Sequence, residues 1–456
     1  MTAPDALRGE ASDPYFPAFM VSAPGKVIVF GEHSVVYDKS AIAAAISLRS
    51  YLHVAPASDS SRTVTLNFPD IHLVHEWPID DLPWAAFEQS GKRKSQDACL
   101  TTLDPDLVAA LQPRVVSVCT DCPDDVRKVH HSAASAFLYL LLSLHDASSL
   151  PGCRYTLRST IPIGAGLGSS ASISVCLATA MLLQQRALFG PRPDQSVVEA
   201  LAQVERINKW AFVGEMCIHG KPSGVDNTVV SQGRAVLYHR GQGVRPLLTF
   251  PQLPLLLVDT RQAKSTAHEV AKVAALESRH PDVVQSVLEA MDQVTCSADI
   301  LLESRALQAP TSVKTATDLE THHLGELMRI NHGLLVSLGV SHPRIERVRE
   351  LVDHEGIGWT KLTGSGGGGC CIALKRPGVS DDDLSRLHRR LCDENYRPLE
   401  TTLGGEGVGI LWNGVDKVDI DYDSFLAAQG TDVMEELMGK GKAGNEGWKY
   451  WGIECK

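Results

Sequence analysis

The sequence lacks the features that mark membrane proteins and nucleic-acid-binding proteins. Its longest apolar run, Ala136 to Leu142, is far shorter than the ~20 residues that span a bilayer. The chain has 43 basic and 54 acidic residues, so its net charge is −11. Nonspecific binding to a nucleic-acid backbone needs an excess of basic residues, which this composition lacks. Residues 1–19 lack the basic flank and apolar core of a signal peptide. We therefore expect a cytoplasmic protein with no membrane and no nucleic acid among its partners.

The sequence also lacks a disulfide framework. Its eleven cysteines are an odd number with no spacing typical of a disulfide-rich scaffold, so we expect reduced thiols. Cys119 and Cys122 form a lone C-x-x-C motif. Because no second pair and no paired histidines lie nearby in the sequence, the motif alone does not favour a metal site.

The length of 456 residues predicts two or three domains with cores of their own. Strand and helix patterns alternate in mixed order, which favours an α+β fold over a single doubly wound sheet. The natural break lies near Gly241. We expect a flexible tail over 1–20, an N-terminal domain over 21–240, a C-terminal domain over 241–415 and an extension over 416–456.

Several elements can be predicted from residue patterns. A strand is expected over Val21 to Phe30, and a helix with an apolar stripe over His130 to His145. The small apolar residues of Ala41 to Leu48 suggest a closely packed helix. In the extension, Ser424 to Leu437 reads as one helix.

Glycine is ordinary in number but clustered in position. Twelve of the 37 glycines fall within 164–168, 364–369 and 404–409. The first cluster lies in Pro162 to Ala171, between an expected strand and an expected helix, where glycines and free N–H groups favour a polyanion. A dinucleotide fingerprint would need glycine at 169, where Ser169 stands, and a Walker loop would need a lysine. The alternative is a tight turn with Ser169 as helix N-cap.

Three further stretches carry charged residues beside glycine, and the last of them is Lys361 to Cys370. Lys26 and the Glu32-His33 pair flank a short apolar strand, and Glu215 and Asp226 are eleven residues apart across a Gly/Pro turn. Such a carboxylate pair can supply a Mg²⁺ ligand and a general base. Taken singly, each acid is more typical of a surface or capping position than of an active site, and a lysine that enters a strand is usually a solvated edge residue.

These stretches together resemble the GHMP small-molecule kinases, and among them the mevalonate kinase family. The resemblance rests on four motifs in the family's order: Pro24 to His33, Pro162 to Ala171, His219 to Asn227 and Thr363 to Cys370. It implies a two-domain GHMP kinase fold. The N-terminal domain would be ribosomal-S5-like α/β, and the C-terminal domain a ferredoxin-like split βαβ.

The resemblance further implies a reaction. It is the ATP-dependent phosphorylation of the C5 hydroxyl of (R)-mevalonate to 5-phosphomevalonate, on the route to isoprenoids and sterols, with Mg²⁺ as cofactor. By this resemblance Asp226 is the catalytic base and Lys26 its cationic neighbour, while Ser170 and Glu215 are the metal ligands. The substrate side holds Glu32, His33 and Thr266. The nucleotide side holds Lys26, Asp70, Ser159, Gly164, Ala165, Gly166, Leu167, Gly168, Ser169 and Ser170.

Two alternatives stay open at this point. The chain can be a GHMP kinase for another small alcohol, or a non-catalytic ligand sensor on the same fold. Asp70 departs from the asparagine common in the family, which puts its contact with the nucleotide in doubt. The resemblance also implies a homodimer, and inhibition by prenyl diphosphates that occupy the ATP phosphate site.

Overall fold

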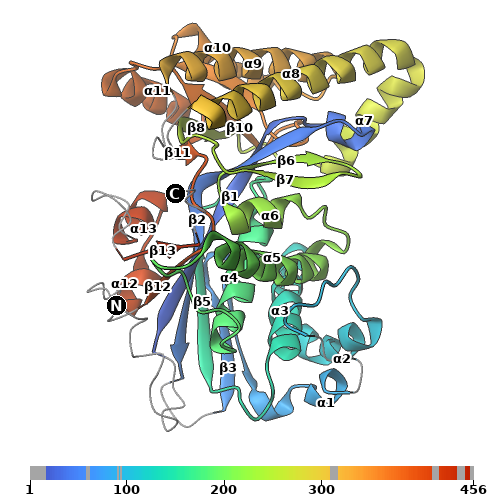
Figure 1. The fold of residues 1–456 in the computed structure, drawn as a ribbon, viewed down its shortest axis with the longest axis vertical. Coiled ribbons are helices and arrows are strands. Elements are labelled where there is room, and N and C mark those ends of the chain that lie inside the picture. The colour runs from blue at the N-terminus through green and yellow to red at the C-terminus, as the bar shows by residue number, and fades with distance from the viewer. Residues whose placement is uncertain are drawn as a thin grey trace.

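The computed structural model describes residues 17–57, 62–89, 92, 95–308, 317–412, 421–438 and 447–451. Two long antiparallel strands, β1 (Phe19–Phe30) and β2 (Ala41–Pro56), run through both halves of the molecule (Figure 1). Strands from the N-terminal and C-terminal halves add to this pair, so the two halves share one continuous sheet path. The site lies where the halves meet.

The N-terminal half is a sheet with helices on one face. Its helices are α1 (Trp84–Phe87), α2 (Pro105–Val116), α3 (Asp124–Leu144), α4 (Ser169–Gln184), α5 (Val197–His219) and α6 (Val225–Gln232). Beyond β1 and β2, its strands are β3 (Thr63–Phe68), β4 (Leu73–Pro78), β5 (Cys153–Ser159), β6 (Ala235–His239) and β7 (Gly243–Leu247). Strand β3 pairs parallel with β5, and the other pairings are antiparallel.

The C-terminal half has a four-stranded sheet in the order β11-β8-β10-β9 and a layer of long helices (Figure 1). Its strands are β8 (Leu253–Asp259), β9 (Gly358–Leu362), β10 (Cys370–Lys375) and β11 (Arg397–Leu403). Its helices are α7 (Thr266–Arg279), α8 (Pro281–Gln308), α9 (Asp318–Ser337), α10 (Pro343–His354) and α11 (Asp381–Asp393). The mixture of helices and largely antiparallel sheet confirms the α+β class.

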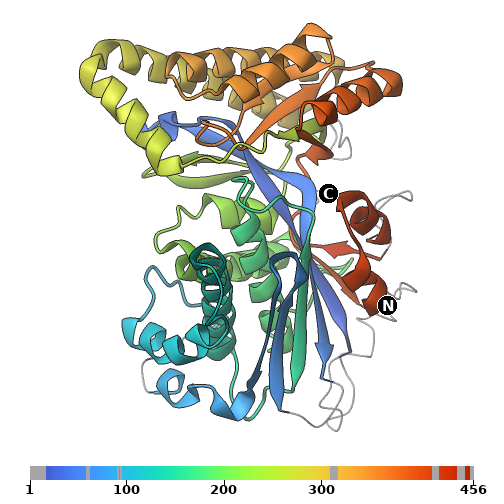
Figure 2. The same cartoon turned by 180° about the vertical axis from the view of Figure 1, so that it is seen from behind.

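The described part of the extension packs against the N-terminal half. It contains β12 (Gly409–Trp412), α12 (Tyr422–Ala427), α13 (Thr431–Leu437) and β13 (Lys449–Tyr450). Figure 2 shows these helices on the face of β1 and β2 away from α3, α4 and α5. The single helix expected over Ser424 to Leu437 is wrong, because the chain forms two short helices there with a break before Gly430.

The helix expected over Ala41 to Leu48 is also wrong, because this segment is the first half of β2. The segment is buried on both faces and pairs with β1 on one side and β6 on the other. Ala43 and Ala45 pack under Val229 of α6, where larger side chains would hold the helix away from the sheet. Tertiary packing therefore overrides the weak strand preference of alanine.

Three further expectations can be compared with the structure: the domain break, the state of the cysteines and the lack of a membrane span. The break expected at Gly241 falls in the turn of the β6–β7 hairpin, and the domain limits stay predictions. Cys119 and Cys122 are joined by a disulfide, which corrects the expectation that every cysteine is reduced; the other eight described cysteines are free. Among the residues the structure describes, no helix is long and apolar enough to cross a membrane.

The third glycine cluster, at 404–409, forms backbone hydrogen bonds with the C-terminal end of α6. The amide of Arg234 donates to the carbonyl of Gly405 at 2.8 Å, and that of Val408 donates to Ser231 at 3.1 Å. A Cβ added at Gly233 would lie 2.2 Å from the amide nitrogen of Gly407. Only glycine permits this approach of two backbones, which anchors the helix that carries Asp226.

This approach predicts unequal effects of two alanine substitutions. Gly233 and Gly241 have similar φ angles of +78° and +81°, but a Cβ at Gly241 meets nothing within 4 Å. Gly233→Ala should lower the free energy of unfolding by about 2–4 kcal/mol, and Gly241→Ala by about 1 kcal/mol. Urea unfolding of the two variants measures both. Equal losses would contradict the close approach.

Candidate active site

A cavity of about 780 Å³ lies between the two halves. Its lining comes from β1, the 162–170 loop, α3, α6 and the segments around 264–270 and 364–365. The volume is that of a typical small-molecule site. Among the lining residues are these predicted ones: Lys26, Glu32, His33, Gly164, Gly166, Leu167, Gly168, Ser169, Ser170, Asp226 and Thr266.

The loop before α4 has the geometry of an anion site. Gly164, Gly166 and Gly168 have φ angles of +72°, +80° and +73°, which strongly favour glycine. Helix α4 begins at Ser169 with Gly168, not Ser169, at the N-cap position. The N-terminal amides of α4 and its helix dipole therefore favour a negatively charged group at this end of the cavity.

Lys26 connects this loop to the carboxylate on α6. Its amide donates to the carbonyl of Leu167 at 2.8 Å, and its Nζ lies 3.1 Å from Oδ1 of Asp226. Asp226 is the second residue of α6, whose N-cap is Gly224. The Asp226 side chain is 34% exposed, so it can reach a ligand in the cavity while it is paired with the lysine.

Glu215, near the end of α5, is buried beside Ser170. Burial raises the pKa of Glu215 to about 7; Ser170 opposes the shift by hydrogen bonding, and the Asp226 charge adds to it. Oε1 of Glu215 is buried and has no hydrogen-bond partner among the described residues. His219 Nε2 lies 3.0 Å from the Ser170 hydroxyl. A buried carboxylate oxygen without a partner, next to a hydroxyl, is a donor set that fits Mg²⁺.

The Glu32-His33 pair faces the C-terminal half. The Glu32 carboxylate forms a fully buried ion pair with Lys361, and Nδ2 of Asn331 donates to its other oxygen at 2.9 Å. Nε2 of His33 lies 2.9 Å from the carbonyl oxygen of Ser365. Both Glu32 oxygens are therefore occupied by protein groups. The carboxylate links β1 and its following turn to Lys361 and Asn331 of the C-terminal half, next to the cavity.

Thr266 faces the same wall from the C-terminal half. Its hydroxyl lies 3.3 Å from that of Ser365, at the first residue of α7. Because Thr266 is exposed to the cavity, its hydroxyl remains within reach of a substrate.

Asp70 and Ser159 lie beside the cavity, and neither belongs to its lining. The Asp70 carboxylate accepts from Nε of Arg158 at 2.8 Å and from the amide of Ser159 at 2.7 Å. Protein donors thus occupy both oxygens of the Asp70 carboxylate, at the position where the family commonly has asparagine. Contact of these two residues with a nucleotide stays a prediction, as does that of Ala165.

Lys264 is a cavity residue that sequence reasoning missed. A Cβ added at Gly166 would lie 2.9 Å from its Nζ, and one at Gly369 would lie 3.0 Å away. The amine thus stands between the two glycine loops. No hydrogen bond or ion pair of Lys264 is found among the described residues, and burial lowers its pKa, with a further lowering from Lys26. The motif pattern contains no signal for it, since it lies in a segment without glycine.

Comparison with known proteins agrees with this geometry. Residues 132–233 match the family model of the GHMP kinases N terminal domain, and residues 319–396 match that of the GHMP kinases C terminal region. The chain is 61% identical to the mevalonate kinase of Gibberella zeae, over 99% of this chain and 91% of that protein. It is 57% identical to that of Aspergillus fumigatus, over 98% and 84%.

Solved structures share the fold. L. major mevalonate kinase in complex with R-mevalonate superposes with a TM-score of 0.56 at 24% identity, over 85% of this chain and 96% of that chain. The two-domain fold and the glycine loop define a GHMP kinase. Within that class, the chain belongs to the mevalonate kinase family.

The burial of Glu215 predicts a pH dependence of stability in metal-free protein. Because its folded pKa is raised from 4.5 to about 7, the folded state loses stability as pH rises through this interval. Glu215→Gln removes this cost, so the stability of the variant relative to wild type should increase by about 2 kcal/mol between pH 5 and 8. Urea unfolding in a chelator measures it. Exposed Glu205→Gln on the same helix is the control, and parallel pH profiles for wild type and Glu215→Gln would contradict the account.

Proposed function

We propose that the protein transfers the γ-phosphoryl group of ATP to the C5 hydroxyl of (R)-mevalonate and so produces 5-phosphomevalonate. The single observation that carries this is the Lys26–Asp226 pair at 3.1 Å, held against the anion-binding loop. Phosphoryl transfer requires positioning and charge neutralisation more than covalent chemistry. An anion loop, a carboxylate and a cation around one cavity supply those requirements. The names of the 61% and 57% identical relatives support mevalonate as the alcohol.

Asp226 would accept a hydrogen bond from the hydroxyl and take its proton as the bond to phosphorus forms. Lys26 pairs with this carboxylate at 3.1 Å and would offset negative charge on the transferring group. Because the Lys26 amide also holds the carbonyl of Leu167, the distance between base and phosphate loop is fixed by one residue.

Ser170 and Glu215 would hold Mg²⁺. The unpartnered Oε1 of Glu215 and the Ser170 hydroxyl are hard oxygen donors of the kind this ion prefers. The ion supplies positive charge to the β- and γ-phosphates when bound. His219, 3.0 Å from the Ser170 oxygen, orients that hydroxyl.

Lys264 would contact the γ-phosphoryl group from the side of the C-terminal half. Its amine lies against Gly166 and Gly369 and has no counter-ion among the described residues. Lys26 and Lys264 both line this cavity, and burial together with the nearby Lys26 charge lowers the pKa of Lys264. An anionic group between them removes this repulsion, which favours phosphate at that point.

His33, Glu32 and Thr266 would form the mevalonate side of the cavity. The same cavity also has apolar walls beside the phosphate loop, among them Phe68, Val129 and Ile173. This neighbourhood supports inhibition by prenyl diphosphates, with the diphosphate on the loop and the chain on the apolar wall. The homodimer and the cytoplasmic location stay predictions.

A kinase for another small alcohol remains the alternative, and a substrate panel separates the two. The sensor alternative requires loss of a catalytic group, whereas Lys26, Ser170, Glu215 and Asp226 all meet in this structure.

Substitution of Asp226 tests the proposed reaction. Asp226→Asn keeps the size but cannot take the proton, so kcat with mevalonate should fall by at least ~10². A coupled assay of ADP release with (R)-mevalonate and Mg²⁺ measures it, with Asp282→Asn, outside the cavity lining, as the control. Wild-type turnover in a folded Asp226→Asn protein would remove Asp226 from this role. Preference for a sugar over mevalonate would favour the alternative alcohol.

Substitution of Lys264 tests its proposed contact. Lys264→Met should lower kcat by about 10²-fold with KM for mevalonate nearly unchanged, because the charge acts on the transferring phosphoryl group. Lys264→Arg should retain more activity, and Lys272→Met on α7 should resemble wild type. A large rise in KM for mevalonate at unchanged kcat would instead place Lys264 on the mevalonate carboxylate.

A further inference from the structure

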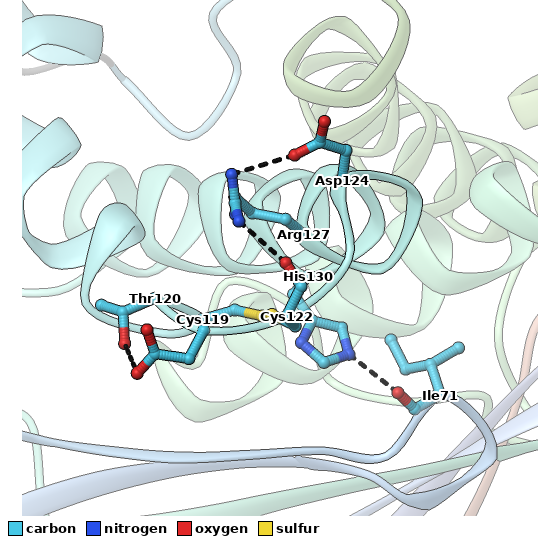
Figure 3. Close-up of a disulfide and its surroundings, with 8 residues drawn as sticks. Ile71, Cys119, Thr120, Cys122, Asp124, Arg127 and His130 are labelled. Carbon is cyan, nitrogen blue, oxygen red and sulfur yellow. Dashed lines mark hydrogen bonds and ion pairs between the residues drawn. A yellow bond between two sulfur atoms is a disulfide. The ribbon is translucent and has the colours of Figure 1, made fainter.

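The fold gives the C-x-x-C motif a third partner that the sequence does not reveal. Cys119 and Cys122 lie in the connection between α2 and α3, and His130 lies two turns into α3. One ligand atom from each of the three residues lies within 4.8 Å of the others. Figure 3 shows the imidazole of His130 directly beside the joined sulfurs.

The ring of His130 is held in one orientation. Its Nε2 lies 2.8 Å from the carbonyl oxygen of Ile71, which can only accept a hydrogen bond. Nε2 therefore carries the proton, and in the neutral ring Nδ1 keeps its lone pair. In Figure 3 this second nitrogen points toward the sulfurs. Donation of one ring N–H to a carbonyl is the usual support of a metal-binding histidine.

The α2–α3 connection, which carries Cys119 and Cys122, is hydrogen-bonded to α3. Nη2 of Arg127 donates to the carbonyl of Cys122 at 2.8 Å, and its Nη1 pairs with Asp124 at 3.1 Å (Figure 3). Cys119 and His130 are buried. Two sulfurs and one imidazole nitrogen are thus preplaced in a sheltered position, which reduces the ordering cost of binding an ion.

We propose that, when its cysteines are reduced, this cluster binds one Zn²⁺ through the thiolates of Cys119 and Cys122 and Nδ1 of His130. A dithiol or phosphine reductant first converts the disulfide to two thiols and is itself oxidised. Zn²⁺ then replaces the two thiol protons, which leave to solvent. Two thiolates and an imidazole match the preference of Zn²⁺, and a fourth position stays open to water.

Metal binding at this cluster would restrain residues that line the substrate cavity. Ile71, which holds the His130 ring, lines that cavity, and so do Lys128 and Val129 on the same turn of α3. Metal binding would fasten the α2–α3 connection to this wall. The oxidised chain, with its sulfurs joined, has no thiolates to offer and would bind no ion there.

Cobalt titration tests the proposal. Phosphine-reduced protein should bind one Co²⁺ per chain with a thiolate-to-cobalt charge-transfer band in the near ultraviolet, and Zn²⁺ should abolish the band. Cys119→Ser should remove the band. His130→Gln, which keeps a side-chain N–H for Ile71, should weaken binding at least ~10-fold. Cys99→Ser, at an exposed free cysteine, should leave it unchanged.

Two outcomes would overturn the proposal. One is a reduced wild-type protein without the band, which would show that the reduced pair binds no metal ion. The other is a band that survives in Cys119→Ser protein of native circular dichroism.

Discussion

Lys26 is the residue on which the geometry of the site depends. Its backbone belongs to β1, its amide donates to the carbonyl of Leu167 in the 162–170 loop, and its ammonium group pairs with Asp226. Gly168 is needed because a Cβ there would lie 2.7 Å from Cγ of this lysine. Sheet, loop and α6 are thereby brought to one point. The positions of the Asp226 carboxylate and of the 162–170 loop follow from packing around a single side chain.

A second buried charge pair ties the C-terminal half to this arrangement. Glu32 and Lys361 are both fully buried, so neither charge can be left without its partner; loss of one partner from such a pair typically costs about 3–5 kcal/mol. Burial lowers the pKa of Lys361, and the Glu32 carboxylate opposes this shift. Next to the pair, His33 reaches Ser365. The second glycine loop is thus placed opposite the first.

Local motifs pointed to the 162–170 loop, Lys26, Glu215 and Asp226 as candidate site residues, because they lie in glycine-rich stretches whose spacing is visible along the chain. The structure brings them close together, and their roles stay predictions. Long-range partners could not be predicted. Lys264, Lys361 and His130 each meet their neighbours only after folding. Alanine-rich β2 was mistaken for a helix because its preference for the sheet comes from burial on both faces.

The proposed reaction requires Asp226 and the 162–170 loop to hold the alcohol and the nucleotide in position for direct transfer. A crystal structure with Mg²⁺, a non-hydrolysable ATP analogue and (R)-mevalonate tests it most directly. We expect the C5 oxygen to lie about 2.6–3.2 Å from the Asp226 carboxylate and in line with the γ-phosphorus. A C5 oxygen turned away from Asp226, with another group in that place, would contradict it.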